Sequence, residues 1–297
     1  MVLIENTVDK KSSVNISTYL TLFKRYFKKF MSKKRPEIPC FDSPIIETHC
    51  HLDYLKQESL EQLLERCESV GIERIITIAV SPDNLQTVRD LCHQHDMIYG
   101  TQGIHPHDAE KYTRDTEDEI RECVVQDRIL AVGEIGLDYY YEHAPKKVQQ
   151  QAFEKQLQIA VDTDKPVVIH SREADEDTQA ILSNFSSSLK RRGVIHSFTA
   201  GIELANYCLN EGFCLGFNGI CTFNKAENVR QVMSQTPLEQ ILLETDAPYL
   251  TPTPYRGEEN APYYLPFIAE KVAEVKGLSV DVVLEQAYKN SIKTFFS

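Results

Sequence analysis

The sequence predicts a TIM-type (β/α)8 barrel of the α/β class, preceded by an N-terminal extension. The chain has 297 residues, and one such barrel needs about 250 residues. From residue 45 onward, short β-rich apolar runs alternate with amphipathic helical patterns, which is typical of parallel strands joined by right-handed crossovers. Eight such runs occur, and eight units fit a closed barrel better than an open sheet.

The extension comprises residues 1–44 and the barrel domain residues 45–297. Residues 1–40 hold nine Lys or Arg and three acidic residues, and residues 19–30 place aromatic and Leu side chains at helical spacing between cations. This pattern has three interpretations: a basic amphipathic helix that docks through residues 19–35 on a membrane or nucleic acid, a solvated helix, or a stretch upstream of a true start at Met31. The three prolines of residues 36–44 then separate the extension from the barrel.

The eight predicted strands alternate with helical segments. Amphipathic helices are expected between them, for example at 60–69 and 150–162, where apolar residues recur every three or four positions. The predicted strands are residues 45–49, 74–80, 98–103, 130–135, 166–170, 193–197, 213–218 and 240–246.

Composition limits the partners of the domain. The chain carries a net charge of −12 although its first 40 residues are basic, and an acidic domain is a poor platform for gripping long duplex DNA. The eight cysteines form no C-x-x-C pair, which favours reduced thiols in a cytoplasmic protein. No apolar run reaches the length of about 20 residues that a membrane-spanning helix requires.

Residues of the types that bind metals follow five of the predicted strands. His49 and His51 are two positions apart at the end of the first strand, so their side chains share one face and form a chelating pair. Glu134 ends the fourth strand between two glycines, and its two oxygens could bridge two ions. His170, His196 and Asp246 end the fifth, sixth and eighth strands.

Taken singly, each of these residues has a structural interpretation. The histidines could be hydrogen-bonded core residues, Glu134 could form an internal salt bridge, and Glu244 could be a structural partner two residues from Asp246. Together, however, they gather at the carboxyl ends of the strands, which in a parallel barrel share one face. The sequence therefore predicts a site for two divalent cations there.

Six sequence blocks also carry a family resemblance over residues 45–297. In order, they are I-E-T-H-C-H-L-D, G-I-H-P-H, G-E-I-G-L-D-Y, V-I-H-S-R, H-S-F-T-A and E-T-D-A-P-Y-L-T-P. The set resembles the TatD-type metal-dependent deoxyribonucleases, which are related to the amidohydrolase-like metal barrels.

The resemblance implies a role for each matching residue. His49, His51, Glu134 and Asp246 would hold one ion, and Glu134, His170 and His196 would hold the second, so that Glu134 bridges. Asp246 would also orient or deprotonate the attacking water, and His105 would contact the phosphate or assist the leaving group. Arg172 and Arg256 are expected to bind substrate, Arg172 because its planar fork matches phosphate oxygens.

The sequence departs from the family pattern at three places. Glu47 stands where the first block usually has Asp, and by strand alternation it shares a face with His49, so its longer side chain could adjust the first metal site. Ala200 replaces the usual Gly, a change we expect to affect only a turn. Glu258 and Glu259 occupy positions that are usually basic, which removes candidate phosphate contacts and argues against a long DNA chain as substrate.

The resemblance implies a hydrolase that cleaves phosphodiester bonds by two-metal activation of water, foremost a 3′–5′ exonuclease on single-stranded DNA or DNA ends. One alternative is an amidohydrolase-like enzyme acting on a small phosphoester, amide or lactone, although Glu134 stands where many such barrels have a modified Lys. A second alternative is a non-catalytic module that docks through its basic extension. The ions could be Mg²⁺, Mn²⁺ or Zn²⁺, and the chain is expected to be a monomer or a weak oligomer.

Overall fold

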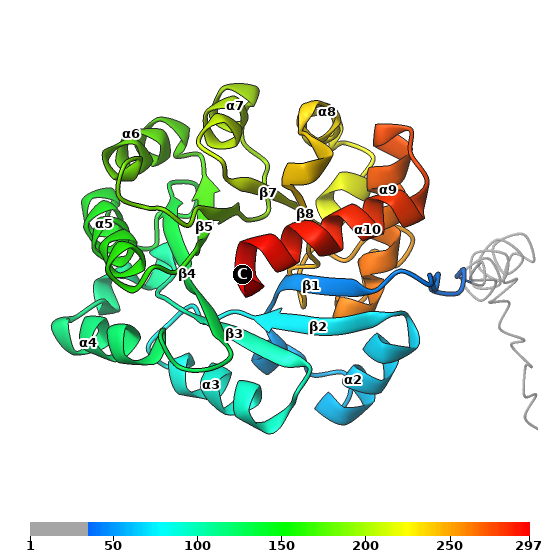
Figure 1. Ribbon diagram of the computed structural model, residues 1–297, viewed down its shortest axis with the longest axis horizontal. Helices are drawn as coiled ribbons and strands as arrows, with labels where there is room; N and C mark the ends of the chain where they lie inside the picture. Colours follow the sequence, from blue (N-terminus) through cyan, green and yellow to red (C-terminus); the bar gives the residue numbers. More distant parts are fainter. Residues whose placement is uncertain (1–34) are drawn as a thin grey trace, which may run out of the picture. The chain divides into compact units, whose positions relative to one another are not determined.

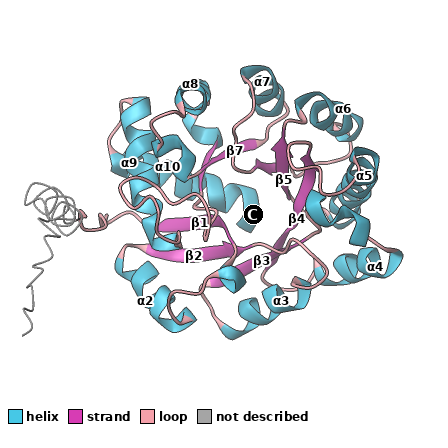
Figure 2. Cartoon of the chain, turned by 180° about the vertical axis from the view of Figure 1, so that it is seen from behind, coloured by secondary structure: helices cyan, strands magenta, loops and turns pink. Residues whose placement is uncertain are grey.

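Eight parallel strands lie in sequence order from β1 to β8 and pair with their neighbours throughout. Figure 2 shows these strands inside a ring of helices. The predicted barrel and its eight strands are therefore confirmed. The strands are β1 (Ile45–Cys50), β2 (Ile72–Thr77), β3 (Ile98–Gln102), β4 (Ile129–Asp138), β5 (Val167–Arg172), β6 (Gly193–Ile195), β7 (Cys214–Phe217) and β8 (Ile241–Leu243).

The barrel closes between β1 and the segment that follows β8. Cys50 and Ala247 form a parallel bridge, His51 N donates to Ala247 O at 2.7 Å, and Asp246 N donates to His49 O at 2.9 Å. This seam brings the two ends of the barrel sequence together, and it carries three of the predicted metal ligands.

Helices surround the barrel, and the last of them runs across one end of it toward the centre (Figure 1). They are α2 (Leu60–Ser69), α3 (Leu85–Gln94), α4 (Arg114–Cys123), α5 (Lys146–Thr163), α6 (Asp175–Phe185), α7 (Ile202–Asn210), α8 (Glu227–Gln235), α9 (Leu265–Lys276) and α10 (Val280–Ser291). Local sequence sets several of their ends. A capping box links Ser59 and Gln62 at the start of α2, which satisfies backbone N–H groups that the first turn leaves unpaired.

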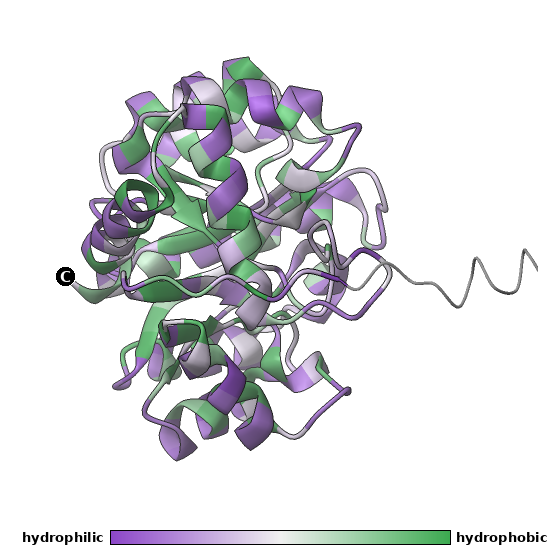
Figure 3. Cartoon of the chain, turned by 90° about the vertical axis from the view of Figure 1, so that its right-hand side faces the viewer, coloured by the Kyte–Doolittle hydropathy of each residue, from purple (hydrophilic) through white to green (hydrophobic). Residues whose placement is uncertain are grey.

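Two clusters of buried apolar residues hold the barrel together, and the larger one contains residues of both the strands and the surrounding helices. Figure 3 shows hydrophobic residues on the strands and on the helix faces that meet them. The other cluster of eight buried residues, among them Ile76, Val168 and Leu242, comes mainly from the strands and includes Phe295 of the C-terminal π-helix η6 (Ile292–Phe296). Layers of such strand residues fill the interior of a (β/α)8 barrel, so the last residues of the chain complete its core.

Several strand boundaries differ from the prediction. The sixth and eighth strands end earlier than expected, because Ser197 (φ 48°) and Asp246 (φ 59°) adopt left-handed backbone conformations that a strand does not tolerate. The fourth strand continues beyond Ile135 to Asp138, paired with β5. That extension carries Asp138 to the mouth of the barrel.

The structure describes residues 35–297, and Ile38–Ser297 form one compact unit. The predicted docking segment at 19–35 lies almost entirely outside the described residues. Within the described part of the chain, no helix combines the length and the apolar character needed to cross a lipid bilayer. Seven of the eight cysteines are buried free thiols, and they pack as small hydrophobic side chains.

Candidate metal centre

The six residues predicted from the sequence to bind metal meet at the carboxyl ends of the strands. Five of them line a cavity of about 670 Å³, and His49 lies fully buried at its edge. The six are His49 in β1, His51 directly after it, Glu134 in β4, His170 in β5, His196 directly after β6, and Asp246 after β8. Sequence positions almost 200 residues apart thus converge on one face, as expected for parallel strands.

Glu134 stands at the centre of this cluster, and its two oxygens face different imidazoles. Oε2 lies 3.4 Å from His49 Nε2. Oε1 lies 3.1 Å from His170 Nδ1 and 3.6 Å from His196 Nε2. One carboxylate therefore connects two groups of nitrogen donors, an arrangement suited to bridging two ions.

Asp246 lies beside the two histidines at the end of β1, His49 and His51. Its Oδ1 lies 3.5 Å from His51 Nε2 and 3.8 Å from His49 Nε2. The rings of His49 and His196 stack with their centroids 3.5 Å apart, so the two sides of the cluster are in contact.

A divalent cation fits these donors. Neither ring nitrogen of the buried His49 has a hydrogen-bond partner among the described residues, and a buried polar atom left unpaired is costly. Donors bound to one ion at about 2.1 Å stand roughly 3 to 3.5 Å apart, similar to the separations of 3.4 and 3.5 Å that involve His49 and His51. Three groups of donors lie close enough to hold an ion: His49–His51–Glu134, His49–His196–Asp246 and His105–Glu134–His170.

Two further carboxylates orient the imidazoles from behind. Asp138 Oδ2 lies 3.0 Å from His170 Nε2, and Glu244 Oε1 lies 3.0 Å from His196 Nδ1. Glu244 Oε1 also accepts a hydrogen bond from Ser197 N at 2.6 Å. Such partners fix the ring orientation and tautomer of metal-binding histidines, and the contact of Glu244 with His196 suits the structural role considered for it from the sequence.

The Glu47 carboxylate contacts backbone N–H groups and not the metal-binding side chains. It is fully buried, and its Oε1 accepts hydrogen bonds from His49 N at 2.9 Å and Thr245 N at 3.0 Å. Burial raises the pKa of the Glu47 carboxyl to about 8, although these hydrogen bonds lower it. Glu47 therefore ties β1 to the end of β8, and it influences the metal centre through the backbone of His49.

The carboxylates and imidazoles of the cluster shift one another's pKa values. Burial raises the pKa of Glu134, but the neighbouring His196 and His105 outweigh burial and hold it well below its usual value. Burial likewise raises the pKa of Asp246, and its hydrogen bond with His51 and the charge of His196 lower it below the usual value. Burial lowers the pKa of His49. Burial acts in the same direction on His51, His170 and His196, but their carboxylate neighbours outweigh it and raise the pKa of all three, that of His196 to about 10. A bound cation requires neutral imidazoles, so its binding would release protons from these histidines.

The three residues predicted to contact substrate differ in their placement. His105 lines the cavity, with its Nε2 3.5 Å from Glu134 Oε1 and its Nδ1 accepting from His107 N at 3.1 Å. Arg172 also lines the cavity, and its guanidinium lies over the ring of Tyr140 at 4.2 Å. Arg256 is exposed, stacks on Phe223 at 3.6 Å and is not part of the cavity lining.

Sequence reasoning missed Asp138 and His107 as parts of the site. Asp138 stands four residues after Glu134 in the same β-strand, on the same face by alternation, and this spacing could have identified it. His107 Nε2 lies 3.0 Å from Asp138 Oδ2. Asp138 therefore connects His107 and His170 at the rim of the cavity.

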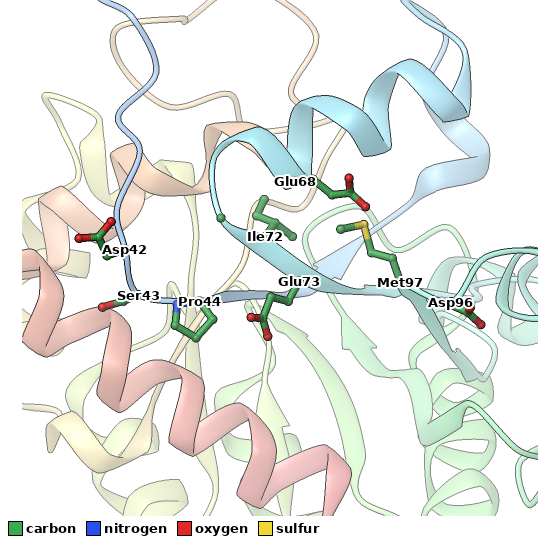
Figure 4. Close-up of a pocket in the computed structure, with 9 residues that line it drawn as sticks. Asp42, Ser43, Pro44, Glu68, Ile72, Glu73, Asp96 and Met97 are labelled. Carbon is green, nitrogen blue, oxygen red and sulfur yellow. The ribbon is translucent and has the colours of Figure 1, made fainter.

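A second cavity lies at the opposite end of the barrel. It has a volume of about 560 Å³ and is lined by residues that precede or begin β1, β2 and β3, including Asp42, Glu68, Glu73 and Asp96 (Figure 4). None of the metal-binding groups formed by the described residues lies there. The metal centre therefore belongs to the cavity at the carboxyl ends of the strands.

Comparison with known proteins identifies the family. The family model described as "TatD related DNase" matches residues 46–296. The chain belongs to this family. It is 36% identical over 256 residues to an uncharacterized metal-dependent hydrolase, YcfH, of Escherichia coli, covering 84% of this chain and 95% of that protein.

Two other TatD relatives agree with this assignment. The "3'-5' ssDNA/RNA exonuclease TatD" of Pantoea ananatis is 32% identical over 241 residues, covering 79% of this chain and 92% of that protein. The crystal structure of the TatD homologue YjjV from Escherichia coli superposes with a TM-score of 0.80 and 28% identity, covering 85% of this chain and 98% of that one. The chain is thus a metal-dependent hydrolase of the TatD type.

Proposed function

We propose that this TatD-type hydrolase cleaves phosphodiester bonds and removes nucleotides from the 3′ end of single-stranded DNA. The observation that carries the proposal is the position of Glu134, whose Oε2 faces His49 while its Oε1 faces His170 and His196. Two ions held side by side by these residues would suit an in-line displacement at phosphorus, a reaction in which the attacking and the leaving oxygen both carry charge. The relative from Pantoea ananatis, named as an exonuclease, supports the same reaction class.

The proposed ligands are those of the sequence prediction. His49, His51, Glu134 and Asp246 would hold one ion, and Glu134, His170 and His196 the other. When bound, these ions supply Lewis-acid stabilisation of phosphoryl charge and a water of lowered pKa.

Three side chains of the cavity have further proposed roles. Asp246, whose side chain is 13% exposed, orients the attacking water and accepts its proton through a carboxylate oxygen. His105 accepts a hydrogen bond at Nδ1, so its Nε2 carries a proton that can be donated to the phosphate or to the leaving oxygen. Arg172 presents a guanidinium to the cavity and binds a phosphate oxygen pair.

The test is release of labelled nucleotide from a 3′-labelled single-stranded DNA oligomer. Metal-stripped protein would be resupplied with Mg²⁺, Mn²⁺ or Zn²⁺, beside an Asp246→Asn variant whose metal content is measured in parallel. We expect metal-dependent release of mononucleotides that the variant loses. A matched 5′-labelled strand should shorten progressively, which distinguishes exonuclease from endonuclease cleavage.

One result would overturn the proposed substrate. If protein shown to bind two ions released no nucleotide with any of the metals, the substrate would be a different one. Small phosphoesters and amides would then be tested first, since the metal barrel also suits them.

A further inference from the structure

Exposed aromatic side chains gather at the mouth of the cavity. Six large hydrophobic side chains are exposed among the described residues, and three of them are tyrosines in segments that follow barrel strands: Tyr140 (53% exposed), Tyr141 (52%) and Tyr249 (53%). Tyr140 and Tyr141 follow β4, and Tyr249 follows β8. An exposed ring costs free energy in water, so a cluster at the entrance to the metal centre points to a ligand with an apolar, flat surface.

The two tyrosines after β4 are fixed relative to the metal centre. The backbone N–H groups of Tyr140 and Tyr141 donate to Asp138 Oδ1 at 3.0 and 2.8 Å. The other oxygen of the same carboxylate lies 3.0 Å from His170 Nε2. One side chain therefore holds both the aromatic turn and a proposed metal ligand.

Arg172 adds a flat cationic surface to this turn. Its guanidinium lies 4.2 Å from the centre of the Tyr140 ring and 4.7 Å from that of the Tyr141 ring. The two rings stand edge to face, 4.8 Å apart at 87°. Tyr140, Tyr141 and Arg172 together form what we call the tyrosine platform, of which Tyr141 and Arg172 line the cavity.

Aromatic rings also border the opposite side of the cavity. Tyr54 stacks on His51 with centroids 5.4 Å apart, and Tyr249 meets His51 edge to face at 6.1 Å. Both tyrosines line the cavity, together with the apolar Ile220 and Leu250. The space above the metal centre is therefore bounded by flat or apolar surfaces on two sides.

Cationic residues, by contrast, are scarce in the cavity. Among the described residues that line it, Arg172 is the only Arg or Lys. Proteins that hold a long single strand use a groove of cations along the backbone, whereas aromatic side chains bind individual bases by stacking. A cavity with one Arg and several aromatic faces is suited to bind only the last one or two nucleotides of a strand.

We propose that the tyrosine platform stacks a nucleobase at the end of the bound strand, so that bases as well as the phosphate select the substrate. This inference rests on the proposed nuclease function and specifies its substrate as a short single-stranded end with intact bases. A base-free phosphoester would lack the part of the substrate that the platform binds.

The experiment compares two oligomers and two variants. One oligomer is an ordinary single strand, and the other carries abasic residues at its two 3′-terminal positions. Both are given to the wild-type protein and to the variants Tyr141→Ala and Tyr141→Phe, and kcat and KM for release of the 3′-terminal label are determined. Metal content and thermal unfolding of each variant are measured alongside.

We expect Tyr141→Ala to raise KM for the ordinary oligomer about 5- to 150-fold, since stacking on one aromatic side chain contributes that much to single-strand binding. The same variant should leave kcat within about twofold. It should not change KM for the abasic oligomer, for which we expect a high KM already in the wild-type protein. Tyr141→Phe keeps the ring and should behave like the wild type.

Two results would overturn the inference and differ in what they say of the proposed function. If KM were the same for the ordinary and the abasic oligomer, in the wild-type protein and in Tyr141→Ala, the platform would not contact bases. Release of nucleotides in the same experiment would still support the nuclease function. No release from either oligomer by metal-loaded protein would contradict the nuclease function and the base platform together.

Discussion

At the residue scale, the proposed metal centre is a set of donors held by three further carboxylates that are not among the proposed ligands. Asp138 orients His170, and Glu244 lies against His196. Glu47 fixes the backbone at His49. Because such partners orient the ligands, and their loss weakens metal binding, they can be tested by mutation as the ligands can.

Gly216 provides such a test, because a Cβ atom there would lie 2.3 Å from Glu244 Oε2. We expect Gly216→Ala to displace Glu244 from His196 and to weaken metal affinity about 10- to 100-fold, with a parallel loss of activity. Metal titration measures the effect. The matched control is Gly201→Ala on the surface, because a Cβ atom there would meet only Glu203 Oε2 at 3.2 Å and Asp175 Oδ2 at 3.7 Å. Unchanged affinity in Gly216→Ala would mean that Glu244 does not position His196.

The convergence of the predicted ligands could be anticipated from the sequence, because a residue at the end of a barrel strand points to one shared face. The role of Glu47 could not, since strand alternation gives the face of a side chain but not the backbone groups that its oxygens meet. Arg256 was expected to bind substrate, and its stacking on Phe223 depends on how two loops fold together. No periodic pattern encodes such loop geometry.

At the element scale, the eight strands and the helices between them followed from the alternation of short apolar runs with amphipathic segments. Strand ends were less predictable. The early ends of β6 and β8 come with positive φ values at Ser197 and Asp246, and nothing in the local sequence requires them. The π-helix η6, which places Phe295 in the core of the barrel, likewise depends on contacts with distant strands.

The contribution of η6 can be measured with Phe295→Ala. The Phe295 side chain is 3% exposed and packs with residues from the barrel strands, so its removal should lower the free energy of unfolding by about 3 to 5 kcal/mol. Urea-induced unfolding gives this value, and Val282→Ala on the exposed face of α10 should stay within about 0.5 kcal/mol of the wild type. A loss below about 1 kcal/mol for Phe295→Ala would show that η6 is not part of the cooperative core.

At the scale of the whole molecule, an acidic chain is proposed to act on a polyanion. Its net charge is −12, and the cavity lining of the described residues contains a single Arg or Lys, Arg172. Binding of DNA should therefore depend on local contacts at the strand end and only weakly on the overall charge of the protein.

The salt dependence of KM tests this conclusion. One or two phosphate contacts to a single strand predict that KM for the oligomer rises only about three- to sevenfold between 50 and 200 mM salt. Replacement of Arg172 by Met should flatten this dependence further. A rise of a hundredfold or more would indicate an extended cationic surface, which the basic residues of positions 1–40 could supply.

The most direct test of the account is the number of metal ions bound by the wild-type protein and by Glu134→Gln. Equilibrium dialysis with Mn²⁺ or Zn²⁺, followed by elemental analysis, measures this number, and Glu154→Gln on the exposed face of α5 is the matched control. We predict two ions per chain in the wild type and the control, and weakened binding of both ions in Glu134→Gln, because Glu134 contacts both groups of imidazoles. Two tightly bound ions and full activity in Glu134→Gln would contradict the bridged centre on which the proposed function rests.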